Sequence, residues 1–142
     1  MTMTSEKSVT SDKRQVTSEE PKSKQDGVYA YKRLKVWHVA DQLAHDIYRL
    51  TKAFPRSEQF GVTTQLRRAA LSVPTNLVEG HARKGRREFK QFVGIALGSL
   101  AEVEYLLEFS LVEGFLSDGA YQSVESTRQG TGKLLWGLYE SM

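Results

Sequence analysis

The sequence predicts an all-α fold in which four helices pack as a bundle. Apolar residues recur at alternating three- and four-residue intervals along four segments, which is the period of a helix that buries one face. Turn-forming sequences separate these segments, and a polar stretch, residues 1–27, precedes them. With 142 residues and no cysteine, the chain is long enough to bury one core without disulfide bonds or metals.

Residues 1–27 are rich in Ser, Thr, Lys and Glu, and their basic and acidic side chains balance. Without an apolar period, such a segment cannot bury enough surface to offset the entropy that ordering removes. We therefore expect residues 1–27 to form a disordered tail and residues 28–142 to form the helical domain.

The first helix is expected from about Lys32 to Phe54, because Pro55 disfavours a helical conformation at the residue before it. Its expected core face is Trp37, Ala40, Ala44, Ile47, Thr51 and Phe54, flanked by Val36, Leu43 and Leu50.

The second helix, from about Val62 to Arg83, carries Pro74 in its middle. A proline removes one backbone hydrogen bond and should kink the helix, so we expect Ser72 and Asn76 to satisfy the freed carbonyl group. The expected core face is Val62, Leu66, Ala69, Ala70, Val73 and Leu77. Beside it runs a polar seam of Gln65, Arg68, Ser72, Asn76, Glu79 and Arg83.

The third helix is expected from about Arg86 to Glu113. Gly94 and Gly98 lower its helix propensity, and we expect them to permit a close approach of another backbone. The expected core face is Phe89, Phe92, Val93, Ala96, Leu100, Val103, Leu107 and Leu111. Apolar residues outside the core faces of the second and third helices are candidates for an oligomer interface, namely Leu71, Val78, Ile95, Leu106 and Phe109.

The fourth helix follows the turn "EGFLSDGA", where Ser117 is the expected N-cap and Asp118 favours the helix start. Its core face is more polar, and its three glycines weaken it, so we expect it to be the most mobile helix. That face is Tyr121, Val124, Arg128, Thr131, Leu135 and Leu138.

The segments "QLRRAALSVPTNLVEG" and "EFKQFVGIALGSLAEVEYLL" carry a family resemblance. With flanking sequence from about Leu34 to Tyr139, the chain resembles the bacterial S23-type, 23S rRNA-intervening-sequence proteins, a branch of which is the accessory protein of diversity-generating retroelements. The resemblance implies an up-down antiparallel four-helix bundle, usually assembled as a homopentamer. It implies little about chemistry, and leaves open whether the chain belongs to a ribosomal RNA or a retroelement.

The charge distribution is uneven. Residues 49–90 contain ten basic side chains against three acidic ones, whereas residues 98–142 contain two against seven. The basic part indicates an anionic partner, RNA or DNA foremost, bound through its backbone because no base-reading motif is present. The candidate phosphate contacts are Arg67, Arg68, Arg83, Lys84, Arg86, Arg87 and Lys90. Alternatively, the basic part meets an acidic protein partner, such as a reverse transcriptase, or an acidic surface of a neighbouring subunit, and the chain is an interaction scaffold.

Catalytic and metal sites are weakly indicated. His38, Asp41 and His45 share one side of the first helix, but no second helix offers matching ligands. Glu79 lies near Ser72 without a histidine, which favours a structural polar seam, with Glu79 paired to an arginine such as Arg68, over a nucleophile and base. We therefore expect no enzyme activity and no cofactor. Since no segment resembles a signal peptide or a membrane span, we expect a cytoplasmic protein without membrane contact.

Overall fold

The computed structural model describes residues 30–142, so the predicted disordered tail, residues 1–27, lies outside the described residues. Four α-helices, with short 3-10 turns before and after the first of them, make up this part of the chain. In chain order the elements are η1 Ala30–Arg33, α2 Lys35–Leu50, η2 Thr51–Ala53, η3 Arg56–Glu58, α3 Val62–Ala82, α4 Arg86–Val112 and α5 Asp118–Glu140.

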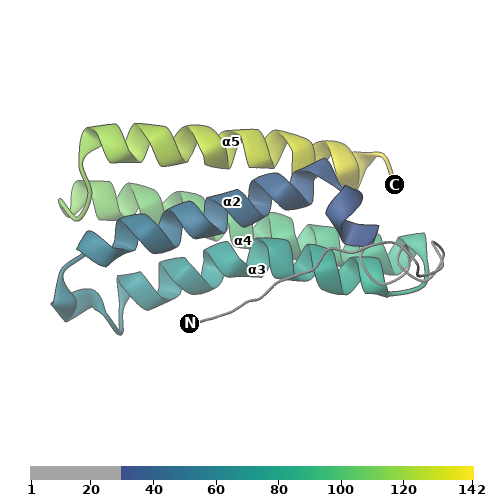
Figure 1. The fold of residues 1–142 in the computed structure, drawn as a ribbon, viewed down its shortest axis with the longest axis horizontal. Coiled ribbons are helices and arrows are strands. Elements are labelled where there is room, and N and C mark those ends of the chain that lie inside the picture. The colour runs from purple at the N-terminus through teal and green to yellow at the C-terminus, as the bar shows by residue number, and fades with distance from the viewer. Residues whose placement is uncertain (1–29) are drawn as a thin grey trace, which may run out of the picture. The chain divides into compact units, whose positions relative to one another are not determined.

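The helices form an antiparallel up-down bundle (Figure 1). Each helix packs against two neighbours, because α3 lies between α2 and α4, while α5 closes the ring by packing against α4 and α2. Short connections force consecutive helices to run in opposite directions. The predicted all-α four-helix bundle is confirmed.

The core consists of the predicted periodic faces, with a few shifts. Most residues placed on the core faces of α2, α3 and α4 are buried. Val36 and Leu43, expected at the flank of α2, are buried, whereas Trp37 is only partly buried. Leu106 was predicted to face another subunit, and this was wrong: it is 6% exposed and belongs to the core. Helix α4 packs against both α3 and α5, so the buried arc of its surface is wider than the single apolar face expected for one neighbour.

The bonds expected around Pro74 are different in the structure. Pro74 is buried inside α3, which continues through it from Val62 to Ala82. The Asn76 amide donates to the carbonyl oxygen of Ser72 at 2.8 Å and to its hydroxyl at 2.9 Å, and that hydroxyl lies 2.8 Å from the hydroxyl of Ser99. The carbonyl freed by Pro74 belongs to Ala70, four residues earlier, so the prediction that these side chains satisfy it was wrong. The hydroxyls of Ser72 and Ser99 join α3 to α4 instead, and the Asn76 amide donates to Ser72 within α3.

The glycine at which α3 and α4 approach most closely is Gly80. A Cβ atom built there would lie 2.5 Å from the Cβ of Phe92. The predicted close approaches at Gly94 and Gly98 are weaker. A Cβ at Gly94 would meet Tyr139 at an ordinary 3.5 Å, and one at Gly98 would meet nothing within 4 Å, so the expectation for Gly98 was wrong within this chain.

Helix α5 contains a buried ion pair that the sequence did not indicate. The predicted N-cap is confirmed, since the Ser117 hydroxyl accepts from the Ala120 amide at 3.1 Å. Further along, Arg128 donates to both carboxylate oxygens of Glu125, at 2.8 and 2.6 Å, and both side chains are only 12% exposed. Arg128 also lies 3.5 Å from Glu104 of α4. This network joins α5 to α4 in addition to the apolar core that both helices share.

Candidate nucleic-acid interface

The connection between α3 and α4 is a tight turn that displays basic side chains. Helix α3 ends at Ala82, and Arg83 leaves it in an extended conformation. Gly85 then adopts a φ of 126°, a region that favours glycine, and α4 begins at the next residue. Gly85 provides no side-chain cap, so the first amide groups of α4 have no capping partner from it. The turn therefore presents both cationic side chains and helix amides at one end of the bundle.

Two of the predicted basic residues at this turn are held by neighbouring groups. Arg83 lies 3.5 Å from Glu79 and 5.2 Å from the centre of the Phe92 ring. Arg86 donates to the carbonyl oxygen of Ser141 at 3.1 Å, which ties the start of α4 to the end of α5. These contacts leave the guanidinium groups at the surface, where both residues are exposed.

Lys84, Arg87 and Lys90 complete the predicted cluster at the turn. Lys84 and Arg87 are exposed, and the Lys90 ammonium lies 4.7 Å from the centre of the Tyr139 ring. Arg87 and Lys90 also line a groove of about 520 Å³ between α4 and α5, the α4–α5 groove, together with Gln91, Gly94, Ile95 and Tyr139.

The bundle topology adds three basic residues that the sequence analysis did not include. Figure 1 shows that the start of α2, the turn between α3 and α4, and the end of α5 lie at the same end of the bundle. Lys32 and Arg33 of η1 and Lys35, the first residue of α2, therefore lie at the same end of the bundle as the turn. The signal was present in the sequence, since an up-down bundle places the start of its first helix beside the turn after its second. We call this surface the basic end: Lys32, Arg33, Lys35, Arg83, Lys84, Arg86, Arg87 and Lys90.

Arg67 and Arg68 do not belong to the basic end. They lie near the start of α3, about 24 Å from Arg83 at the rise of an α-helix. Arg67 donates to the hydroxyl of Thr51 at 2.8 Å and lies 4.7 Å from the centre of the Tyr48 ring. Its role is to join α3 to α2. Arg67 and Arg68 therefore lie apart from the other five candidate phosphate contacts.

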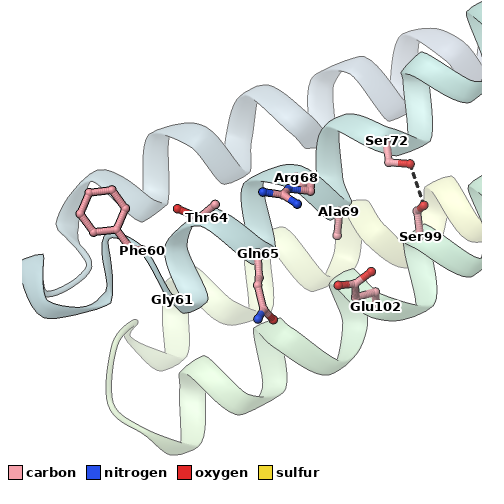
Figure 2. A pocket seen from close by; sticks show the side chains of 9 residues that line it. All are labelled: Phe60, Gly61, Thr64, Gln65, Arg68, Ala69, Ser72, Ser99 and Glu102. Carbon is pink, nitrogen blue, oxygen red and sulfur yellow. Dashed lines mark hydrogen bonds between the residues drawn. The ribbon is translucent and has the colours of Figure 1, made fainter.

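Arg68 lies in a second groove, between α3 and α4, with a volume of about 420 Å³ (Figure 2). Figure 2 shows Arg68 on the α3 side of this groove and Glu102 on the α4 side, with the bonded hydroxyls of Ser72 and Ser99 at one end. The suggested pair between Arg68 and Glu79 is wrong, because the Glu79 carboxylate faces Arg83 instead. No histidine is among the residues that line the groove, so Ser72 has no base beside it there.

The match to known proteins is strongest at the level of the family. The family model of the 23S rRNA-intervening sequence protein matches residues 32–137. The chain belongs to this family. A crystal structure of a protein with unknown function from the S23 ribosomal protein family of Bacteroides thetaiotaomicron superposes with a TM-score of 0.69. It is 24% identical and covers 74% of this chain and 95% of its own, which shows a shared fold. No curated protein matches the chain.

In the present chain, the two histidines considered as metal ligands make other contacts. The Nε2 atom of His38 lies 2.6 Å from the carbonyl oxygen of Lys32, and His45 lies 3.5 Å from Asp41. Within residues 30–142, no group of three or more His, Asp or Glu side chains is placed to hold a metal ion. In the same range, no helix is both long enough and apolar enough to cross a membrane.

The candidate interface residues other than Leu106 lie at or near the surface. Leu71, Ile95 and Phe109 are 47%, 52% and 37% exposed, and Val78 is partly buried. Tyr105 of α4, which the sequence analysis did not select, is 61% exposed. Ile95, Tyr105 and Phe109 lie within an arc of about 80° around α4, since Phe109 is fourteen residues after Ile95 and four after Tyr105, and each step ends about 40° from a whole number of turns. An apolar strip thus remains on the outside of the bundle.

Proposed function

We propose that this chain is a non-enzymatic protein that binds RNA or DNA through the basic end of its bundle. The observation that supports the proposal is that two chain segments with eight Lys and Arg residues lie at one end of the bundle. Such a surface attracts a phosphate backbone and carries no information about base sequence. We therefore expect binding that is insensitive to sequence and weakened by salt.

The pattern of ion pairs supports this proposal over neutralisation within the chain. Arg83 at the basic end has a carboxylate partner in Glu79. Two acidic residues of α4 and α5, Glu104 and Glu125, face Arg128, on a part of the bundle away from the turn. Lys84 and Arg87 of the turn are exposed and so are accessible to an external anion.

RNA is the favoured nucleic acid. The family name connects its members with an intervening sequence of 23S rRNA. We propose a role as an accessory to a ribosomal RNA or, alternatively, to a reverse-transcriptase machine in the cytoplasm.

The test compares two triple variants that change the net charge equally. Lys84, Arg86 and Arg87 are replaced by Ala at the basic end; Arg49, Lys52 and Arg56, which are exposed near the other end of α2, are replaced in the control. Affinity for a labelled single-stranded RNA is measured by fluorescence anisotropy at several salt concentrations. We expect the first variant to bind at least about 10-fold more weakly, with a salt slope reduced by about 2, since each lost phosphate contact removes about 0.7 from the slope.

The control variant should keep the wild-type affinity and slope. Equal losses in the two variants would mean that net charge alone attracts RNA, and the basic end would not be a binding site. A wild-type protein that binds no RNA at 50 mM salt would refute the proposal.

We also propose that the exposed apolar strip of α4 mediates self-association. The expected assembly is the pentamer that the family resemblance implies. Apolar surface at Ile95, Tyr105 and Phe109 has no partner within the described chain, and contiguous exposed apolar surface typically marks an interface. If the chain is instead a scaffold for a different protein, the same strip is the expected docking surface.

Light scattering coupled to size-exclusion chromatography tests this second proposal. Wild type should have a mass near five protomers of 16.1 kDa. Replacing Ile95 and Phe109 by Glu should lower the mass to that of smaller species, because carboxylates would be buried in the interface. Replacing Ser126, exposed on α5, by Glu should leave the mass unchanged. A monomeric wild type would exclude self-association and favour the scaffold.

A further inference from the structure

The α4–α5 groove combines cationic and aromatic side chains in a way that charge alone does not explain. Arg87 and Lys90 line it from α4, and Tyr139 lines it from α5. Beside Tyr139, the Trp136 ring lies 5.6 Å away between centres at 81°. Trp136 is 52% exposed. A half-exposed indole thus lies beside the tyrosine ring that lines the groove together with two cations.

The floor of this groove is open because of a glycine. Gly94 lies on α4 opposite Tyr139, and a Cβ there would be in van der Waals contact, at 3.5 Å, with the Tyr139 ring. Any larger side chain at position 94 would extend into the space beside that ring. The groove, of about 520 Å³, lies in the size range of sites that take small planar ligands.

We propose that an unpaired base of single-stranded nucleic acid lies at the edge of the α4–α5 groove, beside Trp136. In this arrangement, the base stacks on the exposed Trp136 ring, Tyr139 positions that ring by edge-to-face packing, and Arg87 and Lys90 contact the flanking phosphates. The inference rests on the proposed nucleic-acid binding and deepens it, since it specifies single strands over duplexes.

The physical reason is that bases inside a duplex are stacked on one another and cannot reach a protein ring. Single strands expose their base faces, and stacking on an aromatic side chain contributes to binding whatever the base. The basic end supplies the charge contacts that both forms share. The aromatic pair supplies the contact that only the single strand can make.

The experiment measures binding of a 12-nucleotide RNA and of the 12-base-pair duplex that contains it. The variants are Trp136→Leu and Tyr139→Leu, and the control is Phe60→Leu, an exposed ring before α3 that is outside the groove. We expect the single strand to bind roughly 10-fold more weakly to both groove variants, because one stacked base is worth about 5- to 150-fold. Duplex affinity and the salt slope should be unchanged, and Phe60→Leu should bind as wild type does.

The fluorescence of Trp136 gives an independent readout. The chain has two tryptophans, and Trp37 is only partly exposed, with a buried indole nitrogen. Single-stranded RNA should quench the emission of wild type, and the quenching should disappear in Trp136→Leu.

The outcomes separate this inference from the function on which it rests. If wild type binds neither form of RNA, both are overturned. If the groove variants bind the single strand as wild type does, while the Lys84, Arg86 and Arg87 variant does not, the inference fails and the proposed function stands. If Trp136→Leu instead lowers the mass of the assembly, the ring belongs to a subunit interface, and the inference is overturned.

Discussion

Replacing Gly80 by Ala tests how closely α3 and α4 must pack beneath the basic turn. The new Cβ would lie 2.5 Å from the Cβ of Phe92, 3.1 Å from its Cγ and 3.1 Å from Cδ1 of Phe89. Carbon atoms in favourable contact are about 3.5–4.0 Å apart. The nearest atom is the Cβ of Phe92, next to the backbone, so it cannot rotate away as the tip of a side chain could. The helices must therefore move apart.

The expected magnitude follows from two opposing effects. Overpacking a close-packed site costs about 1–3 kcal/mol, and the short distance to Phe92 favours the upper end of that range. Replacing a glycine by alanine in a helix interior contributes about 1 kcal/mol of stabilisation. We expect Gly80→Ala to lower the free energy of unfolding by about 2 kcal/mol. With a slope of about 2 kcal/mol per molar urea, the midpoint falls by about 1 M.

The assay is urea unfolding followed by far-UV circular dichroism, at one fixed protomer concentration because self-association would shift the midpoint. Gly130→Ala is the matched control: the residue lies inside α5, and a Cβ there would meet nothing within 4 Å. It should raise the free energy of unfolding by up to about 1 kcal/mol. A Gly80→Ala protein as stable as wild type, alongside the expected gain in the control, would refute the argument from packing.

Three further predictions concern α5. Ser117→Ala should lower the free energy of unfolding by about 1 kcal/mol in urea titrations, since the bond to the Ala120 amide is lost; no change would mean that water caps the helix equally well. The hydrogen bonds from Arg128 hold the pKa of Glu125 below its ordinary value, so their stabilisation is complete above about pH 4.3 and is lost as the pH falls further. Between pH 5 and 3, Glu125→Gln should therefore lose stability less steeply than wild type, and parallel curves would contradict this. Arg128→Met leaves the Glu125 carboxylate without a cation and with only the Gln129 amide, at 3.3 Å, as a hydrogen-bond donor. It should lower the free energy of unfolding by about 3 kcal/mol at pH 7, with a smaller loss at pH 3; a loss independent of pH would assign the effect to packing.

The fold could be predicted because its information is local and repeated. The helical period alone puts Leu66, Val73 and Leu77 on one face of α3. The cap of α5 is also local, since Ser117 accepts a hydrogen bond from the amide three positions later. What a helix packs against is not local. Leu106 lies at the edge of an apolar arc, and whether such a residue is buried depends on how close α4 lies to its neighbours.

The candidate site was predicted in part for the same reason. The basic run between α3 and α4 is contiguous in sequence, so it remains a cluster in the structure. Arg67 is bonded to a residue 16 positions earlier, which periodicity within α3 cannot reveal. Tyr139 reaches the groove beside Arg87, with Trp136 packed against it, only because α5 returns to the end of the bundle at which α4 begins.

Helix electrostatics give a further argument that the basic end serves binding more than stability. The start of a helix carries a partial positive charge, which favours acidic side chains there by about 0.3–1 kcal/mol each. Helix α2 begins with Lys35 and has no acidic residue in its first turn. Helix α4 begins with Arg86 and Arg87, and Glu88 is the acidic residue of its first turn. These cations oppose the dipole, an arrangement expected at a surface kept for an anionic ligand.

Charge reversal at Arg87 separates the two effects. Arg87→Glu should raise the free energy of unfolding by about 1 kcal/mol, because a carboxylate replaces a cation at the start of α4, while RNA binding weakens. Lys133→Glu is the control: the residue is exposed in the interior of α5, so the same reversal meets no helix end there. Its stability should stay within about 0.5 kcal/mol of wild type. If Arg87→Glu destabilises the fold, the arginine holds the bundle together, and weaker RNA binding by that variant would no longer identify a phosphate contact.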